Sequence, residues 1–150
     1  MRLVYTSAVT EDFLLLCRGL DDTLNELAGG EENRMEYVPL NKTDDIRGVV
    51  VAYDGDMPIG GAGFKRFDET SAEVKRMFVK PEYRGRGVAK GILALIEQKA
   101  KEAGYERLVL ETGGFLIAAN KLYKGIGFRV IPNYGPYVNM PESVCMEKEL

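Results

Sequence analysis

The sequence of 150 residues contains no histidine and only two cysteines. Without histidine, neither a Ser–His or Cys–His nucleophile system nor a histidine-based metal site can form, and no metal is predicted. A general base must then be a carboxylate, a tyrosine, a lysine or a relayed water. Cys17 and Cys145 lie far apart in the sequence. We expect two buried thiols rather than a disulfide, because a reducing compartment disfavours disulfides.

Long apolar runs are also missing. No stretch approaches the ~20 residues that a transmembrane helix requires, and residues 1–6 lack the apolar segment of a signal peptide. The sequence therefore predicts a cytoplasmic protein without a membrane partner. Its length fits one domain, and its 45% hydrophobic and 29% charged residues are typical of a globular protein.

The net charge is only −3, which argues against nonspecific nucleic-acid binding. The charge is uneven, however, because the segment 65–90 carries eight basic and four acidic side chains. Such a segment is either a solvated surface or a site for a polyanionic ligand.

The first half of the chain predicts an antiparallel meander and one helix. Residues 2–9 alternate apolar and polar side chains, which indicates a strand. Thr10 before two acids is typical of a helix start, and Gly29 of a helix end, so a helix is expected between them. The polar residues that follow, up to position 45, are expected to form a mobile loop. Three more strands are expected at residues 48–53, 58–67 and 71–79, the first two joined by a tight turn at residues 54–56.

The second half predicts a strand–helix–strand unit. A helix over residues 87–103 and a strand over residues 107–112 give a right-handed crossover between parallel strands. The remaining elements are a helix over residues 115–124, a strand over residues 127–131, a tyrosine-rich loop and a last strand over residues 143–148. We therefore expect an α/β protein with a mixed sheet, formed by one domain over residues 1–150.

The strand that precedes the crossover helix changes the face on which its apolar residues lie. Ala72 and Val74 occupy even positions, whereas Met77 and Val79 occupy odd ones. Because a one-residue slip exchanges the two faces of a strand, this pattern predicts a β-bulge between Lys75 and Met77. The alternative is that the end of the strand is buried on both faces.

A glycine- and arginine-rich loop leads from this strand into the helix. Residues 84–89, the Gly–Arg loop, read Arg84, Gly85, Arg86, Gly87, Val88 and Ala89, with Lys90 next. A helix N-terminus offers unpaired N–H groups, and glycines let the backbone approach phosphate oxygens closely. The segment is not a P-loop, and Lys90 stands where a dinucleotide fingerprint needs glycine or alanine. The loop predicts a pyrophosphate site, with an ordinary surface loop as the alternative.

The wider arrangement resembles the GNAT N-acetyltransferases. The Gly–Arg loop matches the family's motif A, Arg/Gln-x-x-Gly-x-Gly/Ala, at Arg84, Gly87 and Ala89. Residues 119–128, Ala-Asn-Lys-Leu-Tyr-Lys-Gly-Ile-Gly-Phe, resemble motif B. The order and spacing of the motifs fit the family, and the expected strands match a GNAT-like fold over nearly the whole chain.

This resemblance implies acetyl-coenzyme A as cosubstrate and two central parallel strands that splay around it. The pantetheine arm is expected along the backbone of Met77, Phe78 and Val79. An N–H near Phe78 or Val79 is expected to polarise the thioester carbonyl. The pyrophosphate is expected on the N–H groups of Gly85 to Lys90, and Asn120 is expected to contact the cofactor from the second helix.

The resemblance also implies direct attack of an amine on the thioester. Tyr123 matches the position of the family's general acid, although its spacing also suits a packing residue. A phenol with a pKa of ~10 can protonate a departing thiolate. Glu73 is the expected base and Glu111 the competitor, and either could instead be a surface or ion-paired acid. Lys75 and Arg76 could neutralise Glu73 and lower its basicity.

The acceptor is weakly encoded. Acids in and after the first helix would favour a cationic amine or simply form a solvated face: Asp21, Asp22, Glu26, Glu31 and Glu32. Residues 134–137, Tyr-Gly-Pro-Tyr, could border the acceptor site or form a homodimer contact. A small-molecule amine or amino acid is expected first, and a protein amine second. A noncatalytic acyl-coenzyme A sensor and a nucleotide- or phosphate-binding protein are the alternative classes.

Overall fold

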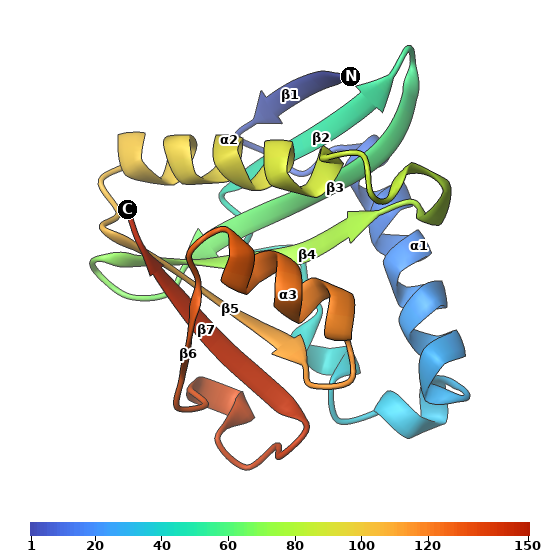
Figure 1. The fold of residues 1–150 in the computed structure, drawn as a ribbon, viewed down its shortest axis with the longest axis vertical. Coiled ribbons are helices and arrows are strands. Elements are labelled where there is room, and N and C mark those ends of the chain that lie inside the picture. The colour runs from blue at the N-terminus through green and yellow to red at the C-terminus, as the bar shows by residue number, and fades with distance from the viewer. The chain divides into compact units, whose positions relative to one another are not determined.

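The computed structural model describes residues 1–150 (Figure 1). The chain forms two compact units. The first unit comprises Met1–Lys65 and Lys75–Ile96, and the second comprises Arg66–Val74 and Glu97–Leu150. The strands pair in the order β1-β2-β3-β4-β5-β7-β6, and β4 (Ser71–Val79) contributes residues to both units. This mixed sheet confirms the predicted fold class. No helix has the length and apolar character needed to cross a membrane.

The strands of the first unit form the predicted meander. Antiparallel ladders join β1 (Arg2–Thr6) to β2 (Gly48–Asp54) and β2 to β3 (Met57–Arg66). In the β2–β3 turn, Gly55 takes the left-handed φ of 60° that a tight hairpin turn requires. The first strand is shorter than expected, because the Thr6 hydroxyl donates to the Ala8 carbonyl at 2.9 Å and the chain turns there.

Helix α1 (Glu11–Ala28) has the predicted ends. The Thr10 hydroxyl accepts a hydrogen bond from the N–H of Phe13 at 3.2 Å, which satisfies one free donor of the first turn. At the other end Gly29 adopts φ 82°, a left-handed conformation that costs glycine little. Both cap residues therefore act as their sequence context predicts.

Two adjacent glycines of β3 let a helix approach each face of the sheet. A Cβ on Gly61 would lie 3.2 Å from Leu16 of α1, and one on Gly60 would lie 3.2 Å from Ile92 of α2 (Val88–Glu102). Neighbouring strand residues point to opposite faces. In this unit α1 and α2 thus cover opposite faces of β3 (Figure 1). The α1 side contains a buried cluster: Phe13, Leu16, Cys17, Ile46, Val49, Val51 and Phe78.

The segment expected to be a mobile loop contains two short 3₁₀ turns, η1 (Glu31–Arg34) and η2 (Val38–Leu40). Arg34 is 8% exposed and donates to the Asn25 side-chain oxygen on α1. This contact attaches the segment to the helix. No periodic pattern in the polar sequence indicates this attachment, because it depends on the single side chain of Arg34.

The second unit holds the remaining strands and a short helix. β7 (Ser143–Glu149) lies between β5 (Arg107–Gly113) and β6 (Arg129–Ile131) and is antiparallel to both. Helix α3 (Ile117–Gly125) begins two positions later than expected, because residues 113–116 form a turn closed by the Leu116 N–H and the Gly113 carbonyl.

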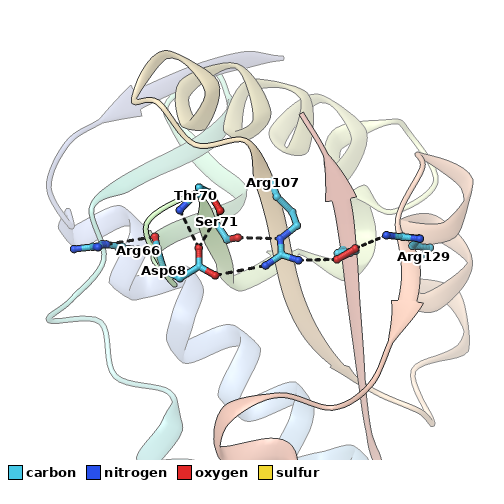
Figure 2. A network of polar contacts seen from close by, with 7 residues as sticks. Arg66, Asp68, Thr70, Ser71, Arg107 and Arg129 are labelled. Carbon is cyan, nitrogen blue, oxygen red and sulfur yellow. Dashed lines mark hydrogen bonds and ion pairs between the residues drawn. The ribbon is translucent and has the colours of Figure 1, made fainter.

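Within the second unit, β4 pairs in parallel with β5. The paired residues are Ser71↔Arg107, Ala72↔Leu108 and Glu73↔Val109. The predicted parallel order of these two strands is thereby confirmed. At the paired end, Arg107 donates to the Ser71 hydroxyl at 2.9 Å and to Glu147 at 2.9 Å. Figure 2 shows the Arg107 guanidinium at the centre of this network, which links β4, β5 and β7.

Candidate active site

A left-handed residue interrupts β4 where the sequence predicts a change of face. Arg76 has φ 60° and is the only non-glycine residue with a positive φ. Consecutive strand residues normally point to opposite faces. At Arg76 this alternation fails. The Arg76 guanidinium donates to the Cys17 carbonyl on α1, and the ammonium of the preceding Lys75 donates to the Leu40 carbonyl in η2, in the segment that follows α1. The left-handed residue thus lies between Lys75 and Met77, where the sequence predicts a β-bulge.

The Arg76 side chain holds this kink against α1. Its guanidinium donates to the Cys17 carbonyl at 3.0 Å and forms an ion pair with Asp21 at 2.6 Å, while only 4% of the side chain is exposed. Its Nε has no hydrogen-bond partner. The sequence offered Arg76 as a possible partner of Glu73, and it did not indicate the pairing with Asp21. The acid on α1 thus compensates a buried charge on β4.

The Gly–Arg loop contains two glycines in conformations that other residues rarely adopt. Gly85 has φ 76° and Gly87 has φ 80°, and a Cβ on either would meet no atom within 4 Å. The strain of a substitution would therefore come from the backbone alone. The open space beside both positions also leaves room for a ligand to reach the main chain.

This backbone presents unused hydrogen-bond donors. The first helical bond of α2 runs from the Gly91 N–H to the Gly87 carbonyl at 3.1 Å, and the N–H groups of residues 85–90 donate to no group of the chain. They lie at the positive end of the helix dipole. Arg86 and Lys90 are exposed beside them. Such a set of donors fits an anion with several oxygens, as a pyrophosphate has.

The loop arginines also have partners within the chain. Arg84 Nε donates to the Val79 carbonyl at 3.0 Å, and its guanidinium lies 5.9 Å from the centre of the Phe78 ring. Arg86 lies 5.4 Å from the centre of the Tyr83 ring. Arg84 therefore ties the loop back to the end of β4, a positioning role that the sequence pattern did not indicate.

Tyr123, on α3, is buried in the second unit. Its side chain is 7% exposed and its ring packs edge-on against Phe128, with centres 5.8 Å apart. Burial, and then the negative charge of Glu111, raise the pKa of the phenol above its usual value. The group is therefore a protonated phenol at neutral pH. Packing and proton donation, the two predicted roles, are both compatible with this position.

Glu73 lies on the part of β4 that belongs to the second unit and is 4% exposed. Its Oε2 accepts a hydrogen bond from the Tyr134 hydroxyl at 2.6 Å. The alternative prediction that Glu73 is a surface carboxylate is therefore wrong, because the residue is buried. Its competitor Glu111 lies on β5 in register with Cys145 and is partly buried.

Asn120 uses its amide nitrogen inside the chain. Nδ2 donates to the carbonyl of Gly113 at 3.0 Å and to that of Leu116 at 2.7 Å. Both bonds fix the turn between β5 and α3. Only the side-chain oxygen remains for a ligand, so the predicted cofactor contact is restricted to a group that donates a hydrogen bond.

Comparison with known proteins decides the family. Residues 17–128 match the Acetyltransferase (GNAT) family. The IAA acetyltransferase of Azospirillum brasilense is 34% identical over 144 residues, which cover 96% of this chain and 94% of that protein. The chain belongs to the GNAT acetyltransferase family. It is accordingly an acyltransferase, as the two motifs predict.

Solved structures share the GNAT fold. A Klebsiella pneumoniae protein described as an acyl-CoA N-acyltransferase superposes with a TM-score of 0.79 at 25% identity, covering 99% of this chain and 97% of that one. The PaiA N-acetyltransferase of Thermoplasma acidophilum, solved with coenzyme A, gives a TM-score of 0.69 at 21% identity over 100% of both chains.

The predicted site residues of this GNAT chain fall into two groups. The first unit holds the donor-binding candidates from Met77 to Lys90, and the second holds Glu73, Tyr123 and Asn120. Sequence reasoning missed the contact of Tyr134 with Glu73. The sequence predicts a tyrosine-rich loop at residues 134–137, but nothing in its composition indicates which carboxylate it reaches.

Proposed function

We propose that the chain, acting as one domain, transfers an acetyl group from acetyl-coenzyme A to the primary amine of a small molecule or amino acid. The observation that carries this proposal is the run of unused N–H groups at residues 85–90, at the start of α2. Family membership supports the same conclusion, and the PaiA relative was solved with coenzyme A.

The donor would bind to the first unit. The N–H groups of Gly85, Arg86, Gly87, Val88, Ala89 and Lys90 would hold the pyrophosphate, and the Arg86 and Lys90 side chains would add positive charge. The backbone of Met77, Phe78 and Val79, beyond the Arg76 kink, would pair with the pantetheine arm. The kink supports this role because a bulge interrupts the ladder and frees backbone groups.

The chemistry requires one proton to be removed and one supplied. Glu73, or Glu111 in its place, would accept the proton of the attacking amine as the N–C bond forms. Tyr123 would donate its proton to the sulfur as the C–S bond breaks, and solvent would reprotonate the phenolate. The products are an amide and free coenzyme A. Burial raises the pKa of Tyr123, so the phenol still carries its proton at neutral pH, as a general acid must.

Two features support a small acceptor. The Azospirillum brasilense relative, which matches 96% of this chain, is named IAA acetyltransferase, after a single compound rather than a protein. Helix α1 carries less uncompensated negative charge than its sequence suggests, because the Asp21 carboxylate forms an ion pair with Arg76. A strongly cationic protein segment would therefore be attracted to α1 less than its composition predicts.

Calorimetry and a substrate screen test the proposal. Coenzyme A should bind at least tenfold more tightly than ATP, since ATP has no pantetheine arm for β4. Equal affinity would indicate a general phosphate site.

In the substrate screen, acetyl-coenzyme A should release free thiol with at least one compound from a panel of small amines, amino acids and peptides. Tight binding without turnover of any amine would indicate a noncatalytic sensor, and turnover of peptides alone would indicate a protein acetyltransferase.

A further inference from the structure

A buried carboxylate and a phenol meet in the second unit although they are far apart in sequence. The Tyr134 hydroxyl donates to Glu73 Oε2 at 2.6 Å. Glu73 is 4% exposed on β4, and Tyr134 precedes η4 (Gly135–Tyr137) in the loop between β6 and β7. The distance is typical of a hydroxyl that donates to an ionised carboxylate.

The Tyr134 ring is held independently of this hydrogen bond. Its ring packs edge-on against Phe67, with centres 4.7 Å apart, and against Tyr137, with centres 5.8 Å apart. The Asn133 amide donates to the carbonyls of Tyr137, Met140 and Ser143 and thereby closes the loop. The loop therefore delivers the phenol to Glu73 from a fixed position.

Tyr137, in the same loop, and Cys145, on β7, are titratable groups close to this pair, and Glu111, on β5, is close to Cys145. Burial raises the pKa of the Cys145 thiol, which stays neutral. Burial, and then the charge and the hydrogen bond of Glu73, raise the pKa of the Tyr134 phenol, which therefore donates its proton rather than losing it.

We propose that Tyr134 is a positioning residue for the general base. Its phenol fixes the Glu73 carboxylate in one orientation, in which it can accept a proton. The short hydrogen bond restrains the carboxylate, because its donor is itself held by ring contacts on two sides. The inference rests on the proposed function, in which Glu73 accepts the proton of the attacking amine.

Tyr134→Phe tests the role, because it removes the hydroxyl and keeps the ring contacts. If the hydroxyl positions the base, kcat should fall about tenfold, as expected for a lost hydrogen bond to a charged group, while the KM for acetyl-coenzyme A stays within about twofold of wild type. An unchanged kcat, or a fall in kcat accompanied by a comparable rise in KM, would indicate a structural role only and overturn the proposal.

Tyr53→Phe is the matched control. The Tyr53 hydroxyl also donates to a carboxylate at 2.6 Å, that of Asp12 on α1, within the first unit. Its loss should leave kcat unchanged. A fall in kcat of the same size in Tyr53→Phe would show that any lost phenol–carboxylate bond has this effect, which also overturns the proposal.

A double-mutant cycle separates this inference from the proposed function. Tyr134→Phe, Glu73→Gln and the double variant are unfolded in urea, and their effects on the unfolding constant should be non-additive by about tenfold. Additive effects would overturn the contact. Full activity in Glu73→Gln would overturn the positioning role while the acetyltransferase function stands. If the cycle shows coupling but the wild type acetylates no amine, the proposed function is refuted, and the positioning role with it.

Discussion

At the scale of single residues, Tyr123 combines a packing contact with a buried, protonated hydroxyl group. Tyr123→Phe keeps the edge-on contact with Phe128 and removes only the hydroxyl. If the phenol is the general acid, kcat should fall at least ~10²-fold, the usual contribution of proton transfer by a positioned side chain. Steady-state kinetics, calorimetry with coenzyme A and thermal unfolding check this. Affinity and Tm should stay near wild type, and an unchanged kcat would leave Tyr123 a packing residue.

Gly87 can be tested against a glycine of the same conformation elsewhere. Gly87 at φ 80° and Gly104 at φ 97° are both left-handed, and a Cβ on either would meet nothing within 4 Å. Alanine at either position should cost about 1 kcal/mol of stability, from backbone strain alone. Only Gly87→Ala should also weaken coenzyme A binding, by about tenfold, because its Cβ lies beside the donor N–H groups.

Urea unfolding and calorimetry on the two glycine variants separate strain from ligand contact. Gly104 lies just after the end of α2, so its variant carries the strain without touching the Gly–Arg loop. Equal coenzyme A affinity in both variants would mean that the loop backbone does not hold the donor. A loss of affinity confined to Gly87→Ala supports the pyrophosphate site.

At the scale of elements, one ion pair joins α1 to the kink of β4. Asp21→Asn would leave the Arg76 guanidinium buried without its counter-charge. Breaking a fully buried pair is strongly destabilising, but 43% of the Asp21 side chain is exposed and solvent screens the charge. We expect a loss of about 1–2 kcal/mol in the free energy of unfolding by urea.

Asp22→Asn provides the comparison on the same helix. Asp22 is exposed and forms no ion pair, so its substitution should change stability by less than ~0.5 kcal/mol. Similar effects in both variants would show that the general acidity of α1 matters, rather than its bond to the kink.

The elements that the sequence predicts well are those with local signals. Thr10 and Gly29 mark the ends of α1 through their own caps, and the alternation around Arg76 locates the kink within two residues. The turns η1 and η2 and the place of β7 between β5 and β6 were not predictable in this way. Their formation depends on contacts such as that of Arg34 with α1 and on strand pairing, which no short stretch of sequence encodes.

At the scale of the whole molecule, the two groups of site residues also differ in whether the sequence marks them locally. The Gly–Arg loop is contiguous, so its glycines, charges and helix start could be recognised together. Glu73 and Tyr134 lie 61 positions apart, and their hydrogen bond exists only because β4 and the loop after β6 meet in one unit. The proposed donor site could therefore be located from the sequence, whereas the environment of the proposed base could not.

The stability of the molecule towards acid depends on the polar network of the second unit. Hydrogen bonds from Arg129 and Arg107 lower the pKa of Glu147, and the Thr70 N–H lowers that of Asp68 (Figure 2). A carboxyl whose pKa is lower in the folded state stabilises that state above its unfolded pKa, and this contribution is lost as pH falls through the folded pKa. For both groups the loss begins below about pH 5.

Glu147→Gln tests this contribution. The Glu147 side chain is 7% exposed and bonded to both arginines, at 2.9 and 2.7 Å, so at pH 7 the variant should lose about 2 kcal/mol of unfolding free energy. The difference from wild type should shrink as pH falls from 5 to 3, because the wild-type carboxyl then becomes protonated as well. Urea unfolding across this range measures it. A difference that stays constant with pH would mean that packing of the side chain, rather than its charge, holds β7 to β5 and β6.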